Sequence, residues 1–169
     1  SELLTCIVGG DSQHYYFNYK DAYKLCDKLG ELKKNHLHID LKVITSRRTS
    51  KLIKEILNKK LKDIASIWNG EGKNPYEEAI QSSSFFIVTS DSTSMISEAA
   101  ISGRPIYIYH LPFKRKSARI SNFHDEFSKI GITRDLKNIK HLENWEYNVL
   151  NESDRIGSII KKRIIEDII

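Results

Sequence analysis

The sequence predicts an α/β domain built on a Rossmann-like parallel sheet, and two observations lead to this fold class. Short apolar runs alternate with amphipathic helical patterns along most of the chain, which implies a parallel sheet with helices on both faces. Residues 85–109 contain a strand, a polar turn, a helix and a second strand, which together make one βαβ unit. Right-handed crossovers would then give the strand order 3-2-1-4-5, with a sixth strand as an open extension.

The length and composition fit a single domain over residues 1–169, large enough to bury a substantial core. The net charge of +5 is mild and suits a phosphate ligand, an acidic partner or solubility alone. With no recognised nucleic-acid motif, a nucleic-acid role is the least expected. No apolar run reaches roughly 18 residues, so we expect a cytoplasmic protein, at most peripheral to a membrane. The start at Ser1, directly before an apolar run, favours a processed protein or a fragment of a longer chain.

Neither cysteine indicates disulfide or metal chemistry. Cys6 lies in a strand pattern and Cys26 on the apolar face of a helix, where small core thiols in a reducing compartment are typical. The chain also lacks metal-ligand spacing, a Walker lysine motif, a nucleophile elbow and the H-E-x-x-H motif. We therefore expect no metal and no required cofactor.

The first half of the chain predicts three strands and two helices. Asn18 and Asp21 form a capping-box pattern ahead of the first helix. The strands are expected at residues 3–8, 41–45 and 64–68. Apolar residues at helical spacing mark the buried helix faces, which are Ala22, Leu25, Cys26, Leu29 and Leu32, then Leu52, Ile53, Ile56, Leu57 and Leu61.

The second half predicts two more strands and four helices. Asn74 followed by Pro75 is a strong helix start, with Asn as the cap and Pro at the first helical position. Asp154 could cap a final helix. The elements between them are expected as strand 85–89, turn 90–94, helix 95–102 ending at Gly103, strand 106–109 and helix 122–130 ending at Gly131.

Two polar turns are the strongest functional signal. In the order 3-2-1-4-5 the first and fourth strands are neighbours, so the turns that follow them lie side by side at the crevice where such sheets bind ligands. Hydroxyls and backbone N–H groups at a helix start suit a phosphate. The candidate phosphate-binding residues in these turns are Gly9, Gly10, Ser12, Ser92, Thr93 and Ser94. The alternatives are a glycine turn that only needs positive φ and a simple N-cap cluster.

Charged residues follow other strands at the same edge. Arg47 and Arg48 come after the second strand, and the guanidinium fork suits phosphate, although solvation of a surface loop is the alternative. Lys114 and Arg115, in the basic run up to Arg119, follow the fifth strand and are candidates for lining the site.

Three further residues are candidates around the turns. Glu98, early in the helix after the fourth strand, could accept hydrogen bonds from a ribose diol or could only interact favourably with the helix dipole. Asp91 would repel a phosphate, so it suits orienting the backbone or binding a sugar hydroxyl. His14 could close over the site or pack against its neighbours.

Several stretches resemble a known family. DSTSMISEAAISGRPIYIY is similar to the donor-domain motif of GT-B glycosyltransferases and their epimerase relatives. More narrowly, IVGGDSQHYYF, VITSRRTS, IWNGEGKNPY, TSDSTSMISEA and FHDEF resemble the mitochondrial-fission Elm family, whose bacterial members are often labelled nucleoside-diphosphate-sugar epimerases. The matches extend from about Ile7 to Phe127, and the segment after about Ile130 has no assigned role.

The resemblance implies the C-terminal, nucleotide-binding half of a two-domain GT-B-like protein, with an N-terminal domain outside this chain. It places the Ser92–Ser94 helix start and the Gly9-Gly10 turn at a diphosphate, Glu98 at the ribose, and Arg47 or Arg48 towards the phosphates. A catalytic base would come from the other half.

Three functions follow as hypotheses. The first is a domain that binds a nucleoside-diphosphate sugar in a GT-B-like glycosyltransferase. The second is a non-enzymatic module on the same fold, which meets a protein partner or an anionic membrane through the basic run and acts in membrane division or partner recruitment. The third is a nucleoside-diphosphate-sugar epimerase, whose acid–base residues cannot be assigned from this chain. The base, the sugar and the acceptor stay open.

Overall fold

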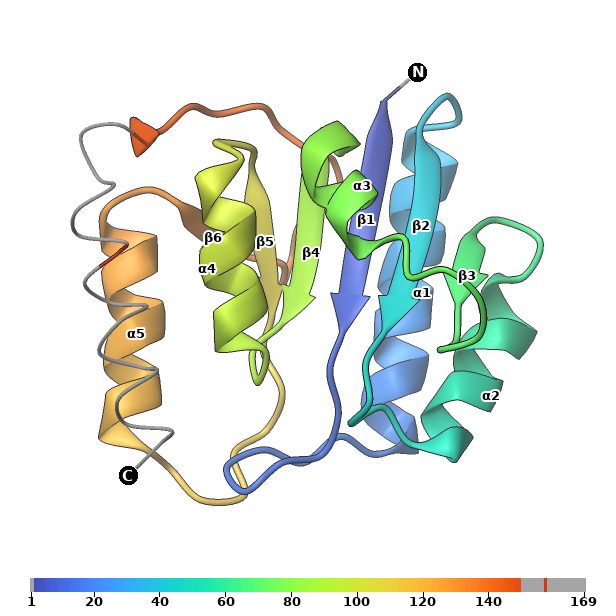
Figure 1. The fold of residues 1–169 in the computed structure, drawn as a ribbon, viewed down its shortest axis with the longest axis horizontal. Coiled ribbons are helices and arrows are strands. Elements are labelled where there is room, and N and C mark those ends of the chain that lie inside the picture. The colour runs from blue at the N-terminus through green and yellow to red at the C-terminus, as the bar shows by residue number, and fades with distance from the viewer. Residues whose placement is uncertain (1, 150–156, 158–169) are drawn as a thin grey trace.

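The computed structural model describes residues 2–149 and 157, so the helix predicted from Asp154 lies outside the described residues. A six-stranded parallel sheet has the order β3-β2-β1-β4-β5-β6, which confirms the predicted order and adds the sixth strand (Figure 1). Its strands are β1 (Leu3–Val8), β2 (Asp40–Thr45), β3 (Ser66–Trp68), β4 (Phe85–Thr89), β5 (Ile106–Tyr109) and β6 (Thr133–Asp135). All of them point the same way, so the turns after them gather at one edge, the lower edge in Figure 1.

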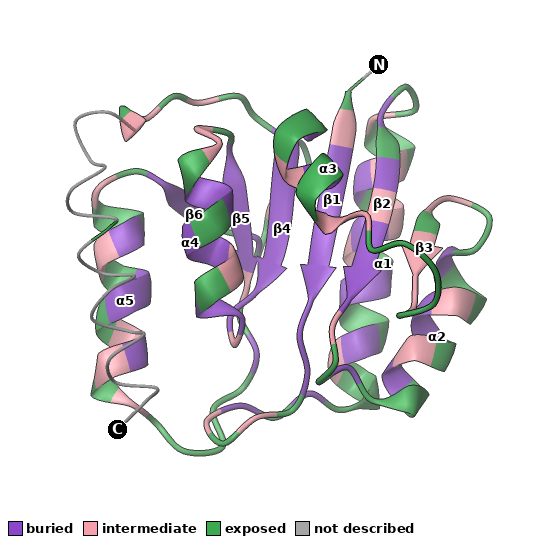
Figure 2. Ribbon diagram, in the orientation of Figure 1, coloured by how far each residue is buried: buried purple, intermediate pink, exposed green. Residues whose placement is uncertain are grey.

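Helices cover both faces of the sheet (Figure 1). Helices α1 (Tyr19–Asn35) and α2 (Lys51–Leu61) lie behind it, whereas α3 (Tyr76–Ser82), α4 (Thr93–Ile101) and α5 (Ala118–Lys129) lie in front. The central strands are therefore buried on both faces, as Figure 2 shows. This double burial explains why their sequences are almost continuously apolar rather than alternating.

Side chains of β1 divide between two apolar clusters. Cys6 and Val8 pack with α1 residues such as Leu25, while Ile7 packs with Ile96 of α4 on the opposite face. Alternation of this kind follows from the two-residue side-chain period of a strand. Both cysteines are free and buried in the α1 cluster, and burial raises the pKa of the Cys26 thiol to about 11, as expected for inert core thiols.

Local capping signals set several of the helix boundaries. The capping box ahead of α1 is confirmed, since Asn18 Oδ1 accepts from the Asp21 N–H at 3.2 Å and Asp21 Oδ2 accepts from the Asn18 N–H at 2.9 Å. The stops of α4 and α5 are confirmed as well, because Gly103 and Gly131 have φ of 75° and 84°.

Some boundaries differ from the predictions. Helix α5 begins at Ala118 rather than at 122, because Ser117 Oγ accepts from the Ile120 N–H at 3.3 Å and caps the helix one turn earlier. Pro75 occupies the cap position of α3 rather than its first helical position, although Asn74 Oδ1 still accepts from the Tyr76 N–H at 3.0 Å. Helix α4 starts at Thr93, two residues before the predicted start.

Strand β3 is shorter than predicted. The N–H groups of Ile64 and Ala65 both donate to Leu61 O, at 3.0 and 2.9 Å, so the turn after α2 uses these residues before the strand begins. No helix in the described part of the chain combines the length and apolar composition that a membrane crossing needs.

Candidate functional site

The turns after β1 and β4 lie side by side, as the strand order predicts. Gly9 N–H donates to Thr89 Oγ1 at 2.9 Å, and Gly10 N–H donates to Asp91 Oδ2 at 3.0 Å. These two bonds join segments that are about eighty residues apart in sequence. They place the glycine turn directly against the start of α4.

Asp91 is the centre of this arrangement. Its side chain is 0% exposed, and it accepts hydrogen bonds from Gly10 N–H, from Thr89 Oγ1 at 2.6 Å and from Arg48 Nη2 at 2.8 Å. Arg48 Nη2 also donates to Ser92 Oγ at 3.2 Å. Asp91 therefore orients backbone, one of its two predicted roles, and ties the turns after β1, β2 and β4 together.

The two glycines are required for close approach rather than for positive φ. Neither Gly9 nor Gly10 is among the residues with positive φ. The alternative of a glycine turn that only needs positive φ is therefore wrong. A Cβ at Gly10 would lie 1.9 Å from Arg48 O, and a Cβ at Gly9 would lie 2.6 Å from Ser92 Oγ. The backbone approaches other parts of the protein itself, and both glycine N–H groups already have acceptors there. Their contact with a phosphate stays a prediction.

Two threonines complete the junction and were missed by the sequence analysis. Thr89 accepts from Gly9 N–H and donates to Asp91. Thr49 Oγ1 is buried, lies 2.7 Å from Gly9 O, and accepts from the Ser46 N–H at 2.9 Å. In both cases a threonine lies close to a polar turn, and its hydroxyl can satisfy backbone groups that leave the sheet at a strand end. That pattern could have identified these two residues from the sequence.

The first turn of α4 has no side-chain cap among the residues that the structure describes. Ser92 is the N-cap residue, but its side chain makes no capping hydrogen bond to the described helix. Thr93 Oγ1 is buried and has no partner within the described chain, and Ser94 is exposed. The leading N–H groups of a helix have no intrahelical acceptor, so an uncapped start is suited to bind a negative group.

A cavity of about 730 Å³ opens beside this helix start. Arg47, Arg48 and Lys54 line one side, and Met95 of α4 lines another. Its volume lies within the range of small-molecule sites. Two of its other lining residues carry buried polar atoms, Trp68 Nε1 and Asn69 Oδ1, that have no partner among the described residues.

Glu98 lies next to this cavity and is already hydrogen-bonded. The Tyr76 hydroxyl, which belongs to a residue lining the cavity, donates to Glu98 Oε2. Burial, and then the bond to Glu98, raises the pKa of Tyr76, so the hydroxyl keeps its proton at neutral pH. One oxygen of the carboxylate predicted for the ribose is therefore already bonded to a protein hydroxyl.

The remaining candidates form a separate group at the same edge. Lys114 pairs with Asp11, and the Lys114 N–H donates to His14 O at 2.8 Å. His14 Nδ1 lies 3.1 Å from Arg115 O, and Ser12 Oγ accepts from the Tyr15 N–H at 3.1 Å. These contacts join the loop after β1 to the loop after β5. Of all the predicted site residues, only Arg47 and Arg48 line the 730 Å³ cavity. The others do not, and they are Gly9, Gly10, Ser12, His14, Asp91, Ser92, Thr93, Ser94, Glu98, Lys114 and Arg115.

A solved structure resembles the whole described domain. The S. aureus MnaA–UDP co-structure matches with a TM-score of 0.61 at 11% identity, over 94% of this chain and 40% of that chain. At that identity the likeness shows the fold alone, and it confirms the predicted Rossmann-like domain of the GT-B type.

Two curated relatives match at the sequence level. Uncharacterized protein RP120 of Rickettsia prowazekii (strain Madrid E) is 31% identical over 165 residues, which is 95% of this chain and 46% of that protein. Mitochondrial fission protein ELM1 of Arabidopsis thaliana is 28% identical over 130 residues, which is 73% of this chain and 29% of that protein. The chain thus spans about half, or less, of the curated relatives it matches.

A family model agrees with both relatives and with the resemblance seen in the motifs. The model described as Mitochondrial fission ELM1 matches residues 1–164, nearly the whole chain. The chain belongs to the mitochondrial fission ELM1 family.

Proposed function

We propose that this chain is the nucleotide-sugar-binding domain of a GT-B-like glycosyltransferase. The observation that carries the proposal is the uncapped start of α4, which meets an arginine-lined cavity at the carboxyl ends of β1 and β2. Of the α4 residues, Met95 in the first turn lines this cavity together with Arg47. The helix dipole and first-turn N–H groups would act with Arg47 on a negative ligand, and a nucleoside diphosphate supplies the matching charge. The UDP named with the MnaA structure supports the same ligand class.

Only some of the predicted phosphate-binding residues would contact the phosphates. Arg47 and the start of α4 at Ser94 would face the diphosphate, whereas Arg48 and Asp91 hold the turns in place. Trp68 Nε1 and Asn69 Oδ1 are buried in residues that line the cavity and have no partner among the described residues, so they would bind polar ligand atoms only after a local rearrangement exposes them. Glu98 would bind the ribose diol after the Tyr76 hydroxyl has moved away.

Catalysis in such a site is electrostatic. N–H groups and a cation stabilise the negative charge that develops on a departing diphosphate. We expect this role to require no metal and no cofactor. A catalytic base and the acceptor site would come from the part of the protein that lies outside this chain.

Nucleotide binding tests the proposal directly. UDP, GDP, ADP and CMP are screened by thermal shift and then titrated by calorimetry. A ligand at ten times its Kd should stabilise the domain by about 1.4 kcal/mol, or roughly 3–6 °C. Arg47→Glu should weaken the affinity about tenfold because it places a repelling charge at the phosphates. Lys59→Glu, the same charge change on an exposed residue of α2, is the control, and equal loss in both variants would contradict the assignment of Arg47.

The Tyr76–Glu98 hydrogen bond gives a sharper form of this test. If the ribose replaces the tyrosine hydroxyl, Tyr76→Phe should tighten nucleotide affinity about two- to fivefold, because the carboxylate becomes available without rearrangement. Glu98→Gln should weaken the affinity about tenfold. Opposite signs for the two variants are the expected result, and unchanged affinity in Glu98→Gln would remove Glu98 from the site.

A second candidate function rests on the exposed basic loop after β5. Lys114, Arg115 and Lys116 are exposed, and Lys114 Nζ lies 5.1 Å from the ring centroid of Tyr16, which is also exposed. Basic and aromatic side chains together suit an anionic membrane interface. If this function is correct, the Lys114→Glu/Lys116→Glu variant should lose sedimentation with anionic vesicles while its nucleotide affinity stays unchanged. Sedimentation equal to that of the unmodified protein would exclude the loop as the membrane contact.

The epimerase alternative shares the nucleotide site. It would require acid and base residues beside the sugar, and no described residue is assigned to that chemistry. Turnover of a nucleotide sugar by the full-length protein would separate the epimerase from the transferase, because only the transferase requires an acceptor.

A further inference from the structure

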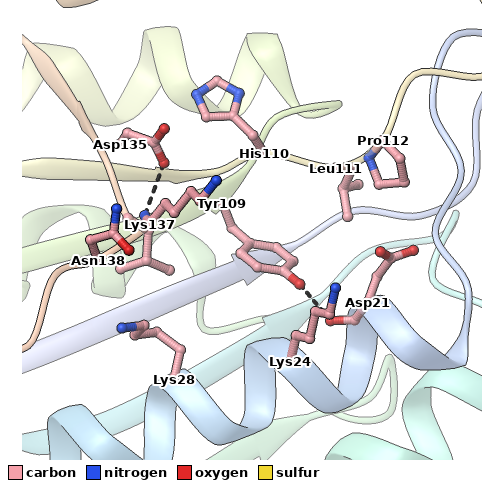
Figure 3. A pocket seen from close by; sticks show the side chains of 11 residues that line it. Asp21, Lys24, Lys28, Tyr109, His110, Leu111, Pro112, Asp135, Lys137 and Asn138 are labelled. Carbon is pink, nitrogen blue, oxygen red and sulfur yellow. Dashed lines mark hydrogen bonds between the residues drawn. The ribbon is translucent and has the colours of Figure 1, made fainter.

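A second cavity, separate from the 730 Å³ cavity, lies beside α1. It has a volume of about 520 Å³ and is lined by α1, by the end of β5 and by the segment from β6 to Asn138 (Figure 3). No residue of the predicted nucleotide site lines it, and its lining differs entirely from that of the 730 Å³ cavity. The volume suits a small molecule of its own.

The floor of this cavity is apolar and fixed in place. Leu111 and Leu136 are buried, and the ring of Tyr109 extends towards α1 (Figure 3). The Tyr109 hydroxyl donates to Asp21 O at 2.7 Å, which holds the ring in one position. Burial raises the pKa of Tyr109, so the ring stays neutral. A fixed aromatic and aliphatic floor suits a flat apolar group.

The rim carries charge from both sides of the cavity. Lys24 and Lys28 project from α1, and Lys137 follows β6, so three ammonium groups surround the apolar floor (Figure 3). Asp21 and Asp135 are the carboxylates of the same lining. Three cations against two anions leave an excess of one positive charge at the rim.

Most of these charged groups already have hydrogen-bond partners within the protein. Lys28 Nζ donates to Ile139 O at 2.6 Å and to Glu31, and each carboxylate accepts from a backbone N–H, Asp21 from Asn18 and Asp135 from Lys137, both at 2.9 Å. The ammonium groups of Lys24 and Lys137 have no partner among the described residues. The ammonium groups of Lys24, on α1, and Lys137, after β6, are thus the cations available to a ligand.

His110 also contributes to the lining, but its ring points away from Tyr109 (Figure 3) and packs edge-on against His124 of α5, with 5.2 Å between the ring centroids. Burial lowers the pKa of His110, although Asp135 and Asp125 act in the opposite direction. The neutral ring adds no charge to the rim of the cavity.

We propose that this cavity binds a small organic anion with a flat apolar body, which rests on Tyr109, Leu111 and Leu136 and meets Lys24 and Lys137 with its charged group. This ligand differs from the nucleotide in its site and in its contacts. The domain would then carry two small-molecule sites with no lining residue in common.

The test titrates the ¹⁵N-labelled protein with phenyl phosphate, which joins a flat apolar ring to an anion, and follows backbone amides by NMR. We expect shifts at Leu111, Lys137 and Asn138. Inorganic phosphate and phenol are titrated in parallel, because each carries one half of the proposed ligand, and neither should shift these amides at concentrations at which phenyl phosphate does. Saturating UDP should leave the same shifts in place, because UDP is expected to shift the amide of Ser94 on α4 instead.

Paired charge reversals supply the control. Lys24→Glu/Lys137→Glu should weaken the affinity for phenyl phosphate about tenfold or more, because two attractions become repulsions. Lys59→Glu/Lys62→Glu makes the same change in net charge at exposed lysines that line neither cavity, and should leave the affinity unchanged.

Three results would overturn the proposal. One is the absence of shifts at Leu111, Lys137 and Asn138 with millimolar phenyl phosphate. Another is an equal response of these amides to inorganic phosphate, which would reduce the site to one for a bare anion. The third is equal weakening in both charge-reversed variants, which would attribute the binding to net charge alone.

Discussion

Gly10→Ala is expected to lower the free energy of unfolding by about 3 kcal/mol, or the Tm by roughly 6–12 °C. The added Cβ would lie 1.9 Å from Arg48 O and 2.3 Å from the Arg48 carbonyl carbon. Both are backbone atoms, so no side-chain rotation can relieve the clash. The turn after β2 must move as a whole, and the hydrogen bond from Gly10 N–H to Asp91 is lost with it.

Gly30→Ala is the matched control for this substitution. Gly30 lies inside α1, and a Cβ there would have no atom within 4 Å. The change should stabilise the domain by about 0.5–1 kcal/mol, since alanine favours a helix interior over glycine. Urea unfolding of both variants measures the difference. Equal stability of the two alanine variants would show that the turns after β1 and β2 are not as closely packed as described.

Asp91→Ala should be the second most damaging change, lowering the free energy of unfolding by about 2–3 kcal/mol. It removes the acceptor of Gly10 N–H, Thr89 Oγ1 and Arg48 Nη2 at once. The guanidinium contributes the smaller share of this cost, because the Arg48 side chain is 49% exposed and solvent screens its charge. The buried backbone N–H and hydroxyl contribute the larger share.

A double-mutant cycle separates these shares. Arg48→Ala alone should lower the free energy of unfolding by less than Asp91→Ala does. The coupling energy between the two residues should be about 1 kcal/mol. Asp11→Ala removes the exposed partner of Lys114 and should change stability by less than about 1 kcal/mol. If Asp91→Ala is as mild as Asp11→Ala, the junction at Asp91 does not hold the three turns together.

The fold was accessible from the sequence because its signals are local. The alternation of apolar runs and helical patterns predicts the parallel sheet, and right-handed crossovers then leave few strand orders to choose from. The capping box at Asn18 and the stops at Gly103 and Gly131 depend on residues next to one another in the chain. The start of α5 was missed because Ser117 follows a run of basic residues that resembles a loop.

The site was only partly accessible, because its bonds join distant segments. Strand order predicts that the turns after β1 and β4 are neighbours, and they are. The hydrogen bonds from the two glycine N–H groups to Thr89 and Asp91 depend on the directions of side chains that follow another strand. The Tyr76–Glu98 bond and the cavity at Tyr109 each depend on how one helix packs against another element. No pattern within a single segment records such packing.

The strand order also has a consequence for the way the chain acquires its structure during synthesis. Strand β1 can pair with β2 soon after both have been made, but its other neighbour, β4, comes only after α2, β3 and α3. Until then, the apolar segment Leu3–Val8 has one edge with unpaired backbone groups, which is a template for joining another nascent chain. Slow translation between β2 and β4 would lengthen this interval, so the yield of folded protein should depend on the synthesis rate of that central segment.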